Sequence, residues 1–272
     1  MYTFEYQRPA DVQGAARAGG VEDTRFLAGG QSLVQAMKLR LSEPASLVDL
    51  GAVAGLAGIT VNGGTVRIGA MTRHSAVAAS ADVRRVLPAL AALAEGIGDP
   101  MVRNAGTIGG SIANADPAAC YPAGVLGLGA TVITDRRSIP GDAFFTGLFE
   151  TALQPGELIV AVEFPVASRA AYIKFKQSAS RFALVGVFVS QGAGGVRVGV
   201  TGVKSAAFRW TEAETALSNG GFKAGALDGL ALDPSDVNGD MHGGPEYRAS
   251  LVATLTKRAV EQANGSVPGA PA

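Results

Sequence analysis

The first fifty residues alternate between helical spacing and strand-like runs of apolar positions. A helix is expected over 11–18, because these residues follow Pro9 at helical spacing and Gly19-Gly20 is a typical stop. Further elements follow in the order strand, glycine turn, helix, strand, at 26–28, 29–31, 32–41 and 46–50. This alternation predicts a small α/β unit.

From residue 59 the pattern becomes strand-like. Apolar residues at 59–61 and 66–68 flank Asn62-Gly63-Gly64, and this turn predicts a β-hairpin because its residues accept positive φ. A β-rich second region therefore starts here. Helices are expected over 72–79, over 82–96 with Asp82 as N-cap and Pro88 as an interruption, and over 117–128, before a strand over 130–134.

In the C-terminal part, the pattern of apolar runs and turn residues predicts an antiparallel sheet followed by two helices. The strands are expected at 158–164, 171–175, 184–190 and 196–203, and the helices at 210–217 and 247–262. The last residues, from 264 on, are Gly, Pro, Ala, Ser and Val after one Asn, and are expected to fray.

Composition narrows the class of protein. With 47% apolar and 17% charged residues, 272 residues can bury a large core, so disorder is excluded as the main state. The chain has 23 basic and 23 acidic residues, so it lacks the broad positive charge that binding to nucleic acid or anionic lipid needs. A nucleic-acid partner is therefore not expected. The 37 glycines are about 14% of the chain, roughly twice the usual ~7%.

Cysteine and histidine are scarce. The single cysteine, Cys120, excludes an internal disulfide and any iron–sulfur or zinc site of four thiolates from this chain alone. The histidines, His74 and His242, lie far apart, and no metal site is expected. The N-terminus lacks a signal-peptide pattern and the most apolar stretch, 123–134, is too short to span a membrane. A cytoplasmic protein without a transmembrane segment is expected.

Two glycine pairs stand in similar surroundings. Glycine lets backbone N–H groups point inward and lets a ligand approach closely, so each pair can form an anion nest. Two such nests could hold a pyrophosphate from both sides, and an ordinary turn is the alternative for either pair alone. A Rossmann GxGxxG unit and a P-loop are both absent from the sequence. The two segments are Ala28-Gly29-Gly30-Gln31-Ser32-Leu33 and Thr107-Ile108-Gly109-Gly110-Ser111.

These segments belong to a longer series of motifs. The series comprises AGGQSL at 28–33, MKLRL at 37–41, LVDL at 47–50, MVRNAGTIGGSIANADPAA at 101–119, PGELIVAVEFP at 155–165, YIKFKQSASRFALV at 172–185 and DMHGGPEYRASL at 240–251. It resembles the FAD-binding medium subunit of the molybdenum hydroxylases, the family of carbon monoxide dehydrogenase and xanthine dehydrogenase. The resemblance covers nearly the whole chain.

The resemblance implies an α+β fold. It has two FAD-binding subdomains of the type shared with vanillyl-alcohol oxidase and UDP-N-acetylenolpyruvoylglucosamine reductase, followed by a C-terminal α+β domain. The expected boundaries are 1–55 and 56–168 for the FAD-binding subdomains, 169–264 for the C-terminal domain and 265–272 for a flexible tail.

The resemblance also assigns cofactor contacts. The two glycine segments, Ala28 to Leu33 and Thr107 to Ser111, would hold the FAD pyrophosphate. Sugar or ribityl contacts would come from the region of Asn114, Asp116 and Cys120, and the isoalloxazine would lie near Ile159, Lys174 or Lys176, and Phe182. For each lysine, a solvated strand face is the alternative to a cation beside the flavin N1–C2 carbonyl.

Three positions depart from the family pattern. Cys120 stands where the family commonly has a carboxylate, and a thiol accepts hydrogen bonds less well than a carboxylate does. Asp116 is the nearby carboxylate that could make this contact instead. Phe182 replaces a tyrosine, and Met101 replaces a glutamine. Cys120 is either a reactive thiol or a plain buried residue, and the second is favoured because no basic neighbour is visible in the sequence.

The resemblance implies an electron-transfer role. Substrate would be oxidised at a molybdenum cofactor on a large subunit, and electrons would pass through two [2Fe–2S] clusters on a small subunit to FAD on this chain. The acceptor would be NAD⁺, a quinone or O₂, the assembly a dimer of heterotrimers, and no catalytic side chain is expected here. A stand-alone FAD oxidase or reductase and a cofactor-free scaffold are the alternatives. Carbon monoxide, an aldehyde, a purine and an N-heterocycle all stay open as substrates.

Overall fold

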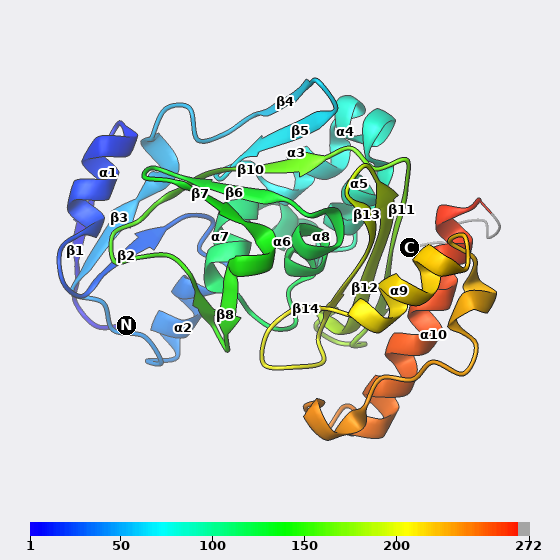
Figure 1. Cartoon of the computed structure of the whole chain (residues 1–272). Coiled ribbons are helices and arrows are strands. Elements are labelled where there is room, and N and C mark those ends of the chain that lie inside the picture. Colours follow the sequence, from blue (N-terminus) through cyan, green and yellow to red (C-terminus); the bar gives the residue numbers. More distant parts are fainter. Residues whose placement is uncertain (266–272) are drawn as a thin grey trace.

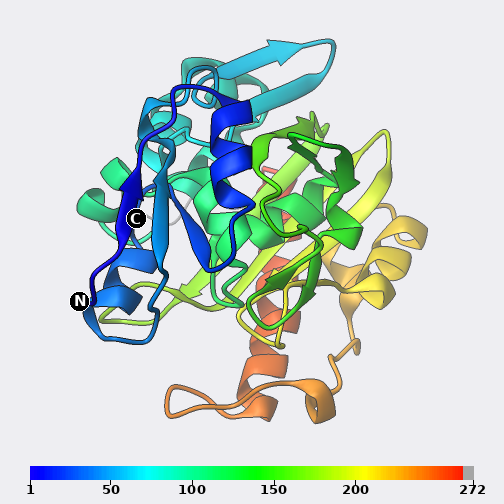
Figure 2. The ribbon, with the colours of Figure 1, turned by 90° about the vertical axis from the view of Figure 1, so that its left-hand side faces the viewer.

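A small parallel sheet opens the chain. The computed structural model describes residues 1–265 and places the strands in the order β1-β3-β2. The Asp11 carboxylate accepts from the N–H of Gly14 and so caps the first helix. Figure 2 shows this blue unit facing the viewer. Its elements are β1 (Glu5–Gln7), α1 (Val12–Gly19), β2 (Thr24–Leu27), α2 (Leu33–Lys38) and β3 (Ser46–Asp49).

A second, antiparallel sheet follows with strand order β4-β5-β10-β6-β7. Asn62 pairs with Thr65 across Gly63 and Gly64, both at positive φ, so the predicted hairpin is confirmed. The strands are β4 (Ile59–Asn62), β5 (Thr65–Gly69), β6 (Thr131–Thr134), β7 (Ser138–Pro140) and β10 (Ile159–Pro165), with a separate small hairpin of β8 (Phe145–Gly147) and β9 (Glu150–Thr151).

Helices occupy the stretch between β5 and β6. The single helix predicted over 82–96 is wrong: the backbone leaves helical geometry at Leu87, because a residue before proline disfavours it, and Pro88 begins a new helix. The cap of the first of these two is Ser80, not Asp82. The helices are α3 (His74–Ala79), α4 (Ala81–Val86), α5 (Pro88–Glu95), α6 (Pro100–Ala105), α7 (Ile108–Asn114) and α8 (Cys120–Leu128).

The C-terminal part is an antiparallel sheet between two helical layers, and the strands predicted at 171–175, 184–190 and 196–203 belong to it. The placement of the strand at 158–164 in this sheet is wrong, because it pairs as β10 with β5 and β6 of the second sheet. In Figure 1, α5 and α8 cover one face and α9 and α10 the other. Tyr172 and Phe188 point into the central core, whereas Val187 and Val189 pack beneath α10. The elements are β11 (Arg169–Lys176), β12 (Ala183–Gly192), β13 (Gly195–Thr201), β14 (Phe208–Arg209), α9 (Thr211–Asn219) and α10 (Pro245–Ala263).

The sheets follow one another along the chain, at 5–49, 59–165 and 169–209. The subdomain boundaries at 55 and 168 stay a prediction, and all but the first residue of the tail expected over 265–272 lies outside the described residues. None of the helices within residues 1–265 is long and apolar enough to cross a membrane.

Candidate functional site

The two glycine segments lie side by side, although about eighty positions separate them. A Cβ added at Gly29 would stand 2.2 Å from the carbonyl oxygen of Ala105, just before the second segment. A Cβ added at Gly110 would stand 3.3 Å from the Cβ of Ala28. Glycine at position 29 therefore permits the close approach of the two backbones.

The first segment presents a row of unused backbone donors. Among residues 1–265, no group accepts a hydrogen bond from the N–H of any of the five residues Gly29 to Leu33. Gly30 has a φ of +68°, the left-handed conformation that turns successive N–H groups toward one side. Gln31 and Ser32 are exposed, so solvent or an anion reaches this row. The predicted nest fits the geometry here.

The second segment is different, and the nest predicted there is wrong. It forms the first turn of α7, where the chain itself takes up the N–H groups. The N–H of Gly109 donates to the carbonyl of Ala70 at 2.8 Å, and that of Gly110 to Thr107 Oγ1 at 3.2 Å. A Cβ at Gly109 would stand 2.6 Å from that of Ala70, so this glycine serves packing. The half-buried Ser111 side chain remains available to a ligand.

His74 supports the second segment from behind. It begins α3, and its N–H donates to the carbonyl of Gly106 at 3.0 Å. Its ring lies so close that a Cβ at Gly106 would stand 2.6 Å from Nε2. Burial, with a smaller effect from Arg103, lowers the pKa of His74 to about 4, so the ring is neutral at pH 7.

Helix α7 leads from the glycine segments to a cavity. Its seven residues rise about 10 Å and end at Asn114, and Ala115 then turns the chain at a φ of +47°. Asp116 follows and lines a cavity of about 260 Å³ together with the half-buried Phe182. One short helix thus connects the row of free donors with this cavity.

The cavity has an aromatic and a charged side. Phe182 packs edge-on against the ring of His242, which is exposed. The Leu148 and Phe149 side chains, both more than half exposed, come from the β8–β9 turn. The full lining is Asp116, Pro117, Ala118, Leu148, Phe149, Phe182, Gly202, Lys204, Asn238, Gly239, Asp240 and Arg248.

Sequence reasoning missed Arg248, which holds this cavity together. The buried guanidinium donates to the carbonyls of Leu184 and Gly202 at 2.9 and 2.6 Å, and pairs with Asp240 at 2.7 Å. The arginine beside it contributes to the lowered pKa of the Asp240 carboxyl, against the effect of burial. Both residues belong to the motif at 240–251, so the signal was present but no role had been attached to it.

Cys120 has a basic neighbour, contrary to expectation. Lys174 Nζ lies 3.3 Å from Cys120 Sγ and also donates to the carbonyls of Gly96 and Arg181. The thiol is 6% exposed, as a plain buried residue would be. Lys176 lies beyond a β-bulge and is exposed. The structure thus separates the two lysines, which the sequence left equivalent.

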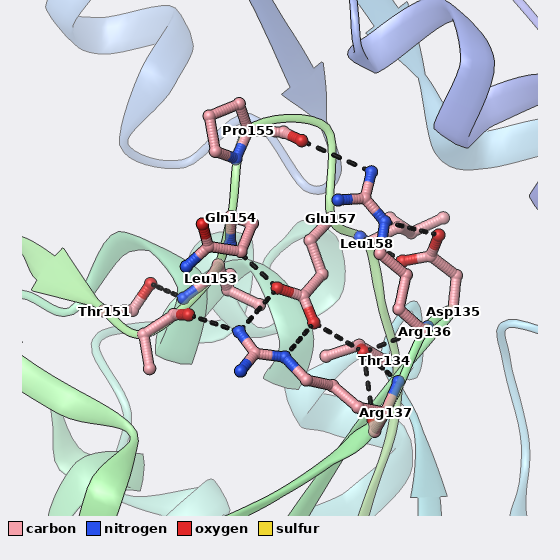
Figure 3. Close-up of polar contacts among 11 residues, drawn as sticks. Thr134, Asp135, Arg136, Arg137, Thr151, Leu153, Gln154, Pro155, Glu157 and Leu158 are labelled. Carbon is pink, nitrogen blue, oxygen red and sulfur yellow. Dashed lines mark hydrogen bonds and ion pairs between the residues drawn. The ribbon is translucent and has the colours of Figure 1, made fainter.

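Ile159 lies in the central core, where an exposed fraction of 4% leaves little surface for a ligand. The turn before it is built around Glu157, which is buried and paired with Arg137 (Figure 3). Thr134 and the N–H of Gln154 also donate to this carboxylate. Chiefly the Arg137 hydrogen bond lowers the Glu157 pKa to about 2. The motif at 155–165 therefore stabilises the fold in this region.

Comparison with known proteins decides the family. Residues 2–167 match the family model described as "FAD binding domain in molybdopterin dehydrogenase". The chain belongs to this family of FAD-binding subunits. Its cofactor is FAD, and it is an oxidoreductase flavoprotein with the α+β fold that the motifs implied.

Relatives match along almost the whole chain. The alpha subunit of the 6-hydroxypseudooxynicotine dehydrogenase complex of Paenarthrobacter nicotinovorans is 36% identical, over 96% of this chain and 94% of the relative. The carbon monoxide dehydrogenase medium chain of Hydrogenophaga pseudoflava is 33% identical, over 96% of both. A solved structure of reconstituted CO dehydrogenase from Oligotropha carboxidovorans superposes with a TM-score of 0.89 at 33% identity, over 98% of this chain and 99% of that one.

Proposed function

We propose that this FAD-binding subunit carries electrons within a heteromeric molybdenum hydroxylase, from [2Fe–2S] clusters on a small partner chain to an external acceptor. A large partner chain would hold the molybdenum cofactor. The observation that carries the cofactor site is the row of five free N–H groups at 29–33, placed one helix length from the Phe182 cavity. Anions bind at such rows of backbone donors.

The residues would divide the cofactor between them. The free donors of Gly29 to Leu33 and the Ser111 hydroxyl would hold the pyrophosphate. Asn114 and Asp116, at the far end of α7, would face the sugar alcohol chain, and Cys120 lies buried behind them. Phe182 would line the ring seat. FAD, when bound, supplies a two-electron acceptor that can release its electrons singly or in pairs.

The side chains around the cavity are suited to positioning rather than to proton transfer. Arg248 already donates to backbone carbonyls and to Asp240. Asp116 accepts from the N–H of Ala118 at 2.8 Å, which fixes its carboxylate. These contacts orient the walls of the site and leave the chemistry of the organic substrate to another chain.

Two features support the division of labour between chains. One cysteine cannot ligate two [2Fe–2S] clusters, so those clusters would lie on a partner. Relatives of 30–36% identity carry names with unlike substrates, among them carbon monoxide, nicotine and caffeine. A type of subunit that is shared by complexes with such unlike substrates is suited to a common electron-transfer task. The acceptor would be NAD⁺, a quinone or O₂.

Co-expression with the neighbouring genes tests this proposal. We expect the chain to carry the visible absorbance of oxidised flavin. It should co-purify with one larger chain that contains molybdenum and one smaller chain that contains iron. Substrate added without oxygen should bleach the flavin only when the iron–sulfur chain is present. A yellow, active chain without partners would favour a stand-alone oxidase, and a colourless chain that takes up no added FAD would favour a scaffold.

A further inference from the structure

Lys174 joins three separate segments at the edge of the third sheet. Its ammonium donates to the carbonyl of Gly96 at 2.6 Å, to the carbonyl of Arg181 at 3.0 Å and to Cys120 Sγ at 3.3 Å. These acceptors lie at the end of α5, in the loop 177–182 and at the start of α8. An ammonium has three hydrogens, so all its donors are used within the chain.

The loop 177–182 is ordered in a way that needs such a contact. Arg181 has a φ of +63°, a left-handed conformation that is strained for a non-glycine residue and persists only where the surroundings hold it. Within the loop, Gln177 Oε1 accepts from the N–H groups of Ala179 and Ser180, and the Gln177 N–H donates to the carbonyl of Phe182. The Lys174 contact attaches this preformed loop to α5 and α8.

Phe182 ends this loop and lines the cavity. We propose that Lys174 is the positioning residue that fixes the loop 177–182, and with it the Phe182 ring, against the FAD-binding side of the molecule, with Cys120 as one of its three acceptors. Only the consequence for the flavin rests on the proposed function. The attachment of the loop is a property of the chain alone.

This assignment separates Lys174 from the role of a cation beside the flavin. Its three hydrogens point to protein acceptors, whereas Lys176, on the other side of the β-bulge, is exposed and free of such contacts within residues 1–265. It also gives the thiol at position 120 a task. A sulfur atom accepts weakly, so most of the attachment comes from the two carbonyls.

Limited trypsin digestion of the full-length, FAD-free chain tests the attachment, because Arg181 is itself a cleavage point. In Lys174→Met we expect cleavage after Arg181 to accelerate by roughly tenfold, since charge-assisted hydrogen bonds close the loop and cleavage follows the open population. Lys176→Met, which loses the same charge two positions away, is the matched control and should digest after Arg181 like wild type. Equal rates for wild type and Lys174→Met would overturn the proposal.

Cys120→Ala gives a graded second variant, useful should Lys174→Met fold poorly. It removes one weak acceptor of three, so its cleavage rate should fall between those of wild type and Lys174→Met. A wild-type rate in Cys120→Ala would overturn the part assigned to the thiol. Unchanged far-ultraviolet circular dichroism shows that the variants compared are folded.

FAD titration supplies the second readout. In Lys174→Met, bound flavin should show changed visible circular dichroism, because Phe182 is no longer held. An unchanged flavin spectrum together with accelerated cleavage would overturn the link to the flavin but not the attachment. A wild-type chain that binds no FAD would instead sink the proposed function, and the digestion would still decide the role of Lys174.

Discussion

The two glycine segments contain the same kinds of residue and do different things with them. At 29–33 the backbone N–H groups donate to no other described residue, and the left-handed Gly30 turns the chain. At 108–111 the N–H groups bond to Thr72, Ala70 and Thr107, and Gly109 lets a helix pack on β5. A glycine pair thus indicates close approach of a backbone, but not whether a ligand or the protein itself approaches.

The difference implies that the segments should respond differently to substitution. Changes at 29–33 should reduce FAD binding more than stability, because the chain itself does not use those donors. Changes at 107–110 should reduce stability first, because the chain does use them. Measuring both quantities on each variant tests whether this division holds.

Gly30→Val should have the largest effect on the cofactor. A β-branched residue at a φ of +68° is strained, and its Cβ would stand 3.0 Å from Val34 Cγ2, so the row of donors must move. We expect FAD affinity to fall by about 100-fold or more, which corresponds to about 2.7 kcal/mol. Flavin titration measures it, and flavin content equal to wild type would contradict the assignment of this segment.

Gly109→Ala should have the largest effect on stability. The added methyl would stand 2.6 Å from the Ala70 Cβ and 2.8 Å from its carbonyl oxygen, and neither can yield without moving β5. Overpacking of this kind costs about 2–3 kcal/mol, or a decrease in Tm of roughly 5–10 °C for a chain of this size. Thermal unfolding of the FAD-free chain measures it. Should the Tm stay unchanged while FAD affinity collapses, the two segments are alike after all.

Glu157→Gln provides a reference outside the glycine segments. It weakens the buried pair with Arg137, and we expect a loss of about 1–2 kcal/mol in the free energy of unfolding, because half-exposed Arg137 keeps part of its hydration. FAD affinity should not change. A variant destabilised to this degree that nevertheless lost FAD would mean that the effect of Gly30→Val is not specific.

The pH dependence of stability tests the Glu157–Arg137 pair without a mutation. The pKa of Glu157 in the folded chain, about 2, lies below the ordinary value of 4.5. The pair therefore stabilises the fold above pH 4.5, and this contribution is lost as the pH falls from 4.5 toward 2. Unfolding by urea across this range should show a smaller pH dependence in Glu157→Gln than in wild type.

The order of elements was predictable where the local pattern dictates it. The hairpin at Gly63-Gly64 and the first helix, which ends at Gly19-Gly20, follow from the residues themselves, and the structure has both. The helix over 82–96 was not predictable in detail, because its apolar spacing continues across Pro88 and only the backbone at Leu87 shows the break. Spacing reports which face is buried, and proline decides where a helix ends.

The site was predictable in its residues but not in their use. Sequence spacing located both glycine pairs, yet which N–H groups are free depends on Ala70 and Thr72, which no motif includes. The neighbour of Cys120 was hidden for the same reason, since Lys174 lies 54 positions away and reaches it only because α5 and α8 pack on the same face of the third sheet. Contacts between distant segments arise from tertiary packing, and one sequence does not display them.

The smallest effects give the sharpest comparison, because they separate the roles of two hydroxyl groups in the second glycine segment, those of Thr107 and Ser111. Thr107→Val removes the cap of α7 with little change of shape, so we expect a loss of about 1 kcal/mol in stability and little direct change in FAD affinity. Ser111→Ala removes a hydroxyl that bonds to no other group within residues 1–265, so stability should stay the same while FAD affinity falls about fivefold, as for one lost hydrogen bond. Chemical unfolding and flavin titration, run on both variants, give four numbers. If Ser111→Ala lowers stability and leaves FAD affinity unchanged, the second segment belongs wholly to the fold, and the pyrophosphate would be held by residues 29–33 alone.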